Sequence, residues 1–299
     1  MKALIHLATA LLIVIKVLVT DLQAQNVRST PVLQSGDDLK LRPGNNLLKI
    51  NFKGAIRELF IELPAEIKKG KRYPVVFGFH GDGGPKEAYN RRLSPYVTKY
   101  NIIGISIQGT PKRVGSRASS WDHHKGSSVD VDDISFVQYL VDYLNKTERA
   151  DLKRIYATGG SSGGLFCYRL AKETQLFAAI GPTKCGMIKG SHEPDSNITP
   201  LSVMQVIGNQ DKSFNGSNKR LTMYSAEQRI KIWRSFLKCN PKPSINTKIK
   251  DMTIKTYVND EGLEVVYCML HGIGHAIPRH IIPIMDEMIV GFFLRHKKH

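Results

Sequence analysis

Short apolar runs alternate along the chain with longer stretches whose apolar residues recur every three or four positions. The short runs predict strands at 59–63, 74–79, 101–108, 154–158, 177–182, 201–208 and 264–270, and the helical spacing predicts helices near 89–100, 131–144, 165–172, 226–237 and 281–296. Strands that alternate with helices indicate βαβ units, so we predict an α/β fold with one mostly parallel sheet covered on both faces. Residues 25–46 and 109–129 lack such a pattern, and we expect a loosely structured lead-in and a long loop.

The first 24 residues differ in character from the rest. They combine an early lysine, an apolar run at 3–15 and the small residue Ala24, which is the layout of a secretory signal peptide cleaved before Gln25. An uncleaved membrane anchor is the alternative, but the uncharged stretch is shorter than the roughly 18–20 residues that a span needs. We therefore expect a signal peptide at 1–24, a single catalytic domain at 25–299, and a secreted protein, extracellular or periplasmic, that does not associate with a membrane after cleavage.

The chain is strongly basic, with a formal net charge of +17. The segment 1–24 contains Lys2, Lys16 and Asp21, so the remainder has about +16. Such an excess attracts polyanions, including acidic polysaccharides and anionic surfaces. The basic residues are scattered and no basic motif is interleaved with aromatic residues, so we do not expect a specific nucleic-acid site.

The four cysteines matter because export leads to an oxidising compartment. They are Cys167, Cys185, Cys239 and Cys268, and they allow two disulfides in three possible pairings. We favour a disulfide between Cys239 and Cys268, which lie in the same C-terminal third. Buried free thiols are the alternative.

The segment 155–166, IYATGGSSGGLF, places a glycine-rich turn between a predicted strand and a predicted helix. The pattern G-x-S-x-G in this context is typical of a nucleophile elbow, whose sharp turn needs glycine two positions before and after the serine. Two frames overlap here, one centred on Ser161 and one on Ser162, and sterics allow both. An inert glycine turn is the alternative.

A serine hydroxyl needs a base, and the base needs an orienting acid. In this fold the three residues follow in the order Ser, Asp or Glu, His. Asp211 follows the predicted strand 201–208, and His275 lies on a glycine-flanked loop after the predicted strand 264–270. Both positions are at the carboxyl ends of strands, where side chains converge above a parallel sheet. His271 is the second candidate for the base.

The segment GFHGDGG at 78–84 ends an early strand with a glycine-rich turn. Such a turn can direct backbone N–H groups at a developing oxyanion. We expect one donor to be the N–H of Ser162, if Ser161 reacts, and the other to come from Gly81 or Asp82. His80 is expected to support this turn rather than to react.

Trp121 is a candidate substrate-binding residue, because aromatic faces bind sugars and phenolic rings. A packing role is the alternative. His123 and His124 are adjacent, but no ligand partners appear at metal-binding spacing, so we predict neither a metal nor another cofactor.

Six blocks together resemble one family of secreted esterases, the LpqC-like polyhydroxybutyrate depolymerases and feruloyl esterases. The blocks are HGDGG, the WD of 121–122, VDDISF, IYATGGSSGG, VIGNQDKSF and HGIGHAIP, and the resemblance extends over roughly residues 55–295. It implies an α/β-hydrolase fold, no metal, and carboxylic ester substrates. These would be polyesters, or hydroxycinnamoyl and acetyl groups on plant polysaccharides.

The same resemblance implies specific roles. The family's elbow, T-G-x-S-x-G-G, matches 158–164 and implies Ser161 as the nucleophile, with Asp211 as the acid and His275 as the base. The chain departs from the family after the base, where Ala276-Ile277-Pro278 lacks the tryptophan that the family has shortly after the histidine, which implies a different acyl pocket. It departs again at Cys268, which lies within the last predicted strand rather than before it, and this weighs against the Cys239 pairing.

These observations predict a serine esterase with an acyl-enzyme mechanism, acting on an ester substrate that can be polymeric. One alternative is a serine peptidase of the same fold, although no additional peptide-binding apparatus is evident. The other is a non-catalytic glycan-binding protein that uses the basic surface. No feature of the sequence specifies an oligomeric state.

Overall fold

The computed structural model describes residues 30–111, 119–125, 131–216, 221–249 and 251–298. All of these except 30–32 belong to one compact unit, Leu33–His299. The predicted signal peptide at 1–24 lies outside the described residues, so its cleavage and the extent of the catalytic domain stay predictions. Among the described residues, no helix combines the length and the apolar character needed to cross a bilayer.

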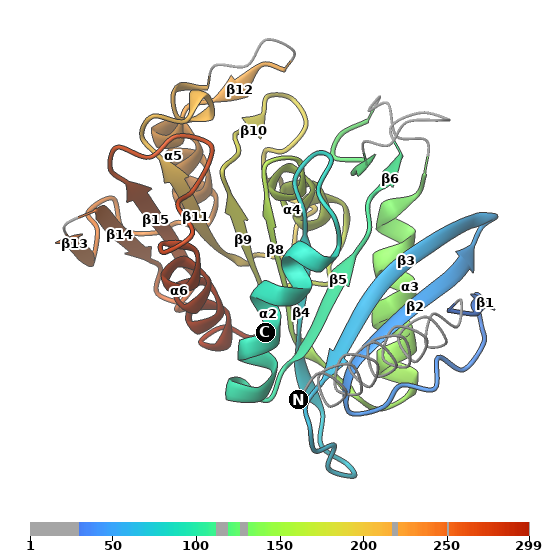
Figure 1. The fold of residues 1–299 in the computed structure, drawn as a ribbon. Helices are drawn as coiled ribbons and strands as arrows, with labels where there is room; N and C mark the ends of the chain where they lie inside the picture. Colours follow the sequence, from blue (N-terminus) through green and yellow to red (C-terminus); the bar gives the residue numbers. More distant parts are fainter. Residues whose placement is uncertain (1–29, 112–118, 126–130, 217–220, 250, 299) are drawn as a thin grey trace, which may run out of the picture. The chain divides into compact units, whose positions relative to one another are not determined.

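The strands and helices follow each other along the chain in the alternating order that the sequence predicts (Figure 1). The strands are β1 (Val32–Gln34), β2 (Gly44–Phe52), β3 (Ala55–Leu63), β4 (Tyr73–Phe79), β5 (Ile103–Ile107), β6 (Thr110–Pro111), β7 (Ser119–Ser120), β8 (Ala150–Gly160), β9 (Ala179–Thr183), β10 (Met187–Ile188), β11 (Ser202–Gly208), β12 (Met223–Tyr224), β13 (Ile245–Ile249), β14 (Met252–Val258) and β15 (Glu264–Leu270). The helices are α2 (Glu87–Tyr100), α3 (Asp133–Lys146), α4 (Ser162–Glu173), the 3-10 helix η1 (Lys212–Asn215), α5 (Ala226–Phe236) and α6 (Ile282–Leu294).

One large sheet organises the unit. From β2 onward its order is β2-β3-β5-β4-β8-β9-β11-β15-β14-β13. The strands from β5 to β15 in that order pair in parallel, whereas β2 and β3 at one end and β14 and β13 at the other pair antiparallel. The prediction of a mostly parallel sheet is confirmed. Parallel pairing places the carboxyl ends of the central strands at one edge, where the site lies.

Helices cover both faces of the sheet (Figure 1). On one face α2 and α6 bury Leu93 and Ile289 in an apolar core. On the other face α3, α4 and α5 bury Phe136, Phe166 and Trp233 in a second and larger core. Burial of apolar surface on both faces is the main stabilising contribution, at about 25 cal/mol per Å², and it gives the central strands their continuous apolar sequences.

A buried ion pair joins β3 to α3. Arg57 donates to a carboxylate oxygen of Asp133 at 2.5 Å, and both side chains are almost completely buried. The other carboxylate oxygen of Asp133 accepts the N–H of Asp122 at 2.8 Å. The preceding residue, Asp132, caps the helix by accepting the N–H of Ser135. The adjacent acids of VDDISF therefore have structural contacts.

The structure corrects the predicted disulfide. All four cysteines are free thiols and all are buried. Cys239 belongs to the core on the α5 face of the sheet, whereas Cys268 belongs to the core on the α6 face. The pairing was wrong because a strand residue points to one face only, and the intervening sheet separates the two sulfur atoms.

Two segments have more structure than the sequence pattern indicates. The expected lead-in at 25–46 contains β1 and the start of β2, and the expected loop at 109–129 contains the antiparallel pair β6–β7. The strands β2, β13 and β14 were not predicted.

Candidate active site

Ser161 lies at the turn between β8 and α4. Its backbone angles are φ 57° and ψ −120°, a strained conformation for a residue with a side chain. A Cβ placed on Gly159 would lie 2.4 Å from backbone atoms of Gly163, and a Cβ on Gly163 would lie 2.2 Å from the Phe79 carbonyl oxygen, so glycine is required on both sides of the turn. Of the two overlapping frames in the sequence, the structure has the one that is centred on Ser161.

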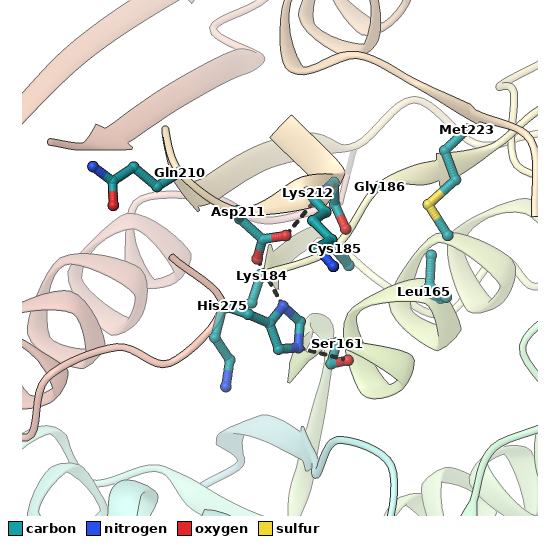
Figure 2. Close-up of a pocket in the computed structure, with 11 residues that line it drawn as sticks. Ser161, Leu165, Lys184, Cys185, Gly186, Gln210, Asp211, Lys212, Met223 and His275 are labelled. Carbon is teal, nitrogen blue, oxygen red and sulfur yellow. Dashed lines mark hydrogen bonds and ion pairs between the residues drawn. The ribbon is translucent and has the colours of Figure 1, made fainter. Parts of the chain in front are cut away.

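A chain of hydrogen bonds connects three predicted residues (Figure 2). The Nε2 atom of His275 lies 3.1 Å from Ser161 Oγ, and Nδ1 lies 2.7 Å from Asp211 Oδ2. A carboxylate can only accept, so Nδ1 has the proton and the Nε2 lone pair faces the hydroxyl. The structure thus brings Ser161, His275 and Asp211 together with the geometry that general-base catalysis requires.

The acid is buried and the base is exposed. The side chain of Asp211 is 2% exposed and that of His275 is 55% exposed. Burial raises the pKa of Asp211, but hydrogen bonds from His275 and from the N–H of Ser213, at 2.8 Å, outweigh it, so the net pKa of Asp211 is below its ordinary value. Asp211 is therefore ionised near neutral pH and can stabilise a protonated imidazole.

Hydrogen bonds join the loop that contains His275 to the loop that contains Asp211. The carbonyl of Ile273 accepts the N–H of Gln210 at 2.9 Å, and Asn209 Oδ1 accepts the N–H of Gly272 at 2.8 Å. The loop crosses so close to the end of β11 that a Cβ on Gly208 would lie 2.0 Å from the Ile273 carbonyl oxygen. Gly208, which the sequence analysis did not single out, thus allows the loop that precedes His275 to lie directly against the end of β11.

The turn at 80–84 packs against the nucleophile. A Cβ on Gly81 would lie 3.3 Å from Ser161 Cβ, and a Cβ on Gly163 would lie 2.6 Å from the carbonyl oxygen of His80. Ser162 is the first residue of α4, where N–H groups have no partner within the helix. Its hydroxyl is buried without a hydrogen-bond partner among the described residues, so it faces packed protein rather than the cavity.

His80 holds this turn in place. Its Nδ1–H donates to the carbonyl of Gly81 at 2.7 Å, and Nε2 accepts the N–H of Gly109 at 2.8 Å. Burial lowers the pKa of His80, so the ring is neutral. These contacts agree with the supporting role expected for His80.

Trp121, the predicted substrate-binding residue, lies in the core and does not line the cavity. It is 1% exposed, its ring stacks on Phe166 and meets Phe79 edge-on, and its Nε1–H donates to the His80 carbonyl at 2.8 Å. The packing alternative is therefore the correct one, because the indole fills the core beneath the turn. His271, the second candidate for the base, interacts through Nε2 with Thr253 Oγ1 at 2.9 Å and does not line the cavity.

A cavity of about 510 Å³ opens above the serine. Its walls combine apolar side chains with two lysines. The lining residues are Ser161, Leu165, Lys184, Cys185, Gly186, Gln210, Asp211, Lys212, Ser213, Met223 and His275. Figure 2 shows Leu165 and Met223 on one side of the hydroxyl and Lys184 extending past the imidazole on the other side. The sequence analysis missed both lysines, although Lys184 follows a predicted strand just as Asp211 does.

This chain has the α/β-hydrolase fold. That fold consists of a mostly parallel sheet with helices on both faces and a serine at a strand–turn–helix elbow. The same fold is found in the solved acetyl xylan esterase from Aspergillus awamori. The TM-score is 0.55 with 16% sequence identity, over 83% of this chain and 99% of that one. No family model matches the chain.

Sequence relatives are esterases at low identity. The chain is 25% identical over 238 residues to feruloyl esterase B of Piromyces equi, and 23% identical over 232 residues to the bifunctional acetylxylan esterase/xylanase XynS20E of Neocallimastix patriciarum. The matches cover 74% and 75% of this chain but only 42% and 31% of the relatives. The chain thus spans less than half the length of these two proteins.

Proposed function

We propose that the protein is a carboxylic ester hydrolase with Ser161 as nucleophile, His275 as general base and Asp211 as the orienting acid. The observation that carries this proposal is the continuous hydrogen-bonded path from the Ser161 hydroxyl through the imidazole to the buried carboxylate. The esterases among the relatives support the same reaction class.

The acylation step follows from the proton positions. Nε2 of His275 takes the hydroxyl proton as Ser161 Oγ forms a bond to the ester carbonyl carbon, and Asp211 stabilises the resulting imidazolium. The negative charge that develops on the carbonyl oxygen is held by the N–H of Ser162 and by the N–H of Gly81 or Asp82. The loss of one such donor costs about 10²–10³ in rate.

The second half of the cycle uses the same groups. The ester bond breaks, the imidazolium gives its proton to the departing alcohol, and an acyl group remains on Ser161 Oγ. A water molecule then gives a proton to Nε2 and attacks the acyl carbon, and the carboxylic acid leaves as the serine regains its proton. Every proton is transferred through His275, so the proposed steps need no cofactor.

The proposed substrates are feruloyl or acetyl esters of plant polysaccharides, with hydroxyalkanoate polyesters as the further possibility that the sequence resemblance adds. The names of the relatives favour the polysaccharide esters. We also propose that the protein acts after secretion, which follows from the signal-like segment 1–24 and agrees with an extracellular polymer as substrate.

A serine-reactive fluorophosphonate probe tests the proposal directly. The wild-type protein should be labelled, and Ser161→Ala should remove both labelling and turnover of methyl ferulate, acetylated xylan or a hydroxybutyrate oligomer. Ser162→Ala is the matched control and should only weaken turnover, because the Ser162 hydroxyl is buried away from the cavity.

Three other outcomes of these assays would point to a different nucleophile or a different function. The reverse pattern in the two serine variants would move the nucleophile by one position. Absence of labelling would favour the non-catalytic glycan-binding alternative. Turnover of peptide substrates together with no ester turnover would favour the peptidase.

A further inference from the structure

Lys184 is fixed in the wall of the cavity that contains Ser161. It follows β9, has a left-handed backbone with φ 52°, and donates its N–H to the carbonyl of Val206 at 3.0 Å. A Cβ placed on Gly160, the residue before Ser161, would lie 3.0 Å from Lys184 Cε and 3.5 Å from Nζ. The ammonium group is therefore held close to the backbone that leads into the elbow, and its side chain lines the same cavity as Ser161.

Among the described lining residues, no carboxylate forms an ion pair with this ammonium group, although the charge of Asp211 acts on it from a distance. Asp211 is the one acidic residue among the described lining residues, and its oxygens are bonded to His275 and to the Ser213 N–H. Neither Lys184 nor the second cavity lysine, Lys212, forms an ion pair with a described residue. Within the described part of the chain, the two cavity lysines thus have no ion-pair partner.

A further cation lies near Lys184 but is already paired. Arg92 donates from Nε to Asp286 Oδ2 at 2.9 Å. Burial, and secondarily the charge of Arg92, lower the pKa of Lys184. A partly desolvated ammonium group gains strongly from an added anion, because the anion restores the interactions that burial removed.

We infer that Lys184 binds a carboxylate of the substrate, so that the preferred ester has an acidic group on its acyl part or on its alcohol part. This inference rests on the proposed esterase function. An ammonium group provides three donors and a compact charge, which suit a carboxylate, and Lys212 adds to the positive field of the cavity. The overall net charge of +17 attracts the same class of acidic molecule from solution.

The test compares esters that differ only in charge. One pair has the carboxylate on the alcohol part, 4-acetoxybenzoate against 4-acetoxybenzamide. The other has it on the acyl part, monomethyl adipate against the methyl ester of adipamic acid. The ratio of kcat/KM within each pair is measured for the wild type, for Lys184→Met and for Lys212→Met. Lys231→Met is the control, because Lys231 is exposed on α5 and outside the cavity.

The wild type should prefer the carboxylate in one pair, which identifies the acidic part of the substrate. Lys184→Met should reduce that ratio roughly ten- to hundredfold, as expected for the loss of a charge-assisted hydrogen bond, while Lys231→Met keeps it. The ratio does not depend on the fraction of active protein, so partial misfolding does not imitate the effect.

Two results would overturn the inference and leave the esterase proposal standing. One is hydrolysis of the neutral esters with the same ratio in the wild type and Lys184→Met. The other is a preference that is lost only in Lys212→Met. Failure of the wild type to hydrolyse any of the four esters would overturn the inference, and it would overturn the esterase proposal as well only if fluorophosphonate labelling and turnover of methyl ferulate also failed.

Discussion

Gly208→Ala should misplace the proposed base without touching any reacting group. The new Cβ would lie 2.0 Å from the carbonyl oxygen of Ile273, against about 3.4 Å for an ordinary contact, so the loop has to move by about 1.4 Å. Ile273 is two residues before His275, whose Nε2 lies only 3.1 Å from Ser161 Oγ. A misplacement of about 1 Å costs about a hundredfold in rate, which is about 2.7 kcal/mol in activation free energy.

The assay is kcat/KM on an activated ester, together with the rate of fluorophosphonate labelling, and both should fall about a hundredfold. Overpacking of this kind also destabilises the fold by about 1–3 kcal/mol, so circular dichroism has to show that the variant is folded. The matched control is Gly274→Ala in the same loop. The nearest atom to its Cβ is the Gln210 carbonyl oxygen at 3.9 Å, and its rate should stay within about twofold of the wild type. A folded Gly208→Ala protein with wild-type activity, or an equal loss in both glycine variants, would refute the reasoning.

Three further predictions concern stability. Burial lowers the pKa of His192 from 6.5 to about 3, so below pH 6.5 the unfolded state takes up a proton that the folded state does not. The free energy of unfolding should therefore fall between pH 6.5 and 3, by at most about 5 kcal/mol, and His192→Gln should flatten this slope in urea titrations. Asp133→Ala leaves the Arg57 charge buried without its partner and should cost about 3–5 kcal/mol, seen as a lower urea midpoint; a loss below 1 kcal/mol would contradict a tightly buried pair. Because all four cysteines are free, a reductant should leave Tm unchanged, and a thiol reagent should titrate four groups in urea without prior reduction.

The alternating pattern predicted the central strands and the helices but missed strands at the ends of the sheet. Every residue of the strands β4, β5 and β11 is buried and most of them are apolar, so these strands are easily recognised in the sequence. In β2 and β14, by contrast, polar residues alternate with apolar ones over a strand that is only partly buried. Such a segment differs little from a loop when the neighbouring strand is unknown.

The sequence predicted some residues of the candidate site and missed others, and the reason is geometric. Asp211 and His275 follow from one rule, that side chains at the carboxyl ends of parallel strands converge. Lys184 obeys the same rule, but the direction of its side chain depends on a left-handed backbone, which the sequence Thr-Lys-Cys does not specify. Trp121 was misassigned because neither a loop position nor an aromatic character indicates whether a ring faces solvent or packs inward.

More than half of the His275 side chain faces solvent. The proposed polymeric substrate can therefore meet the imidazole directly from solvent. Fragments and intact chains would then reach the serine by the same route. Cleavage could begin anywhere along a polymer rather than only at its tip.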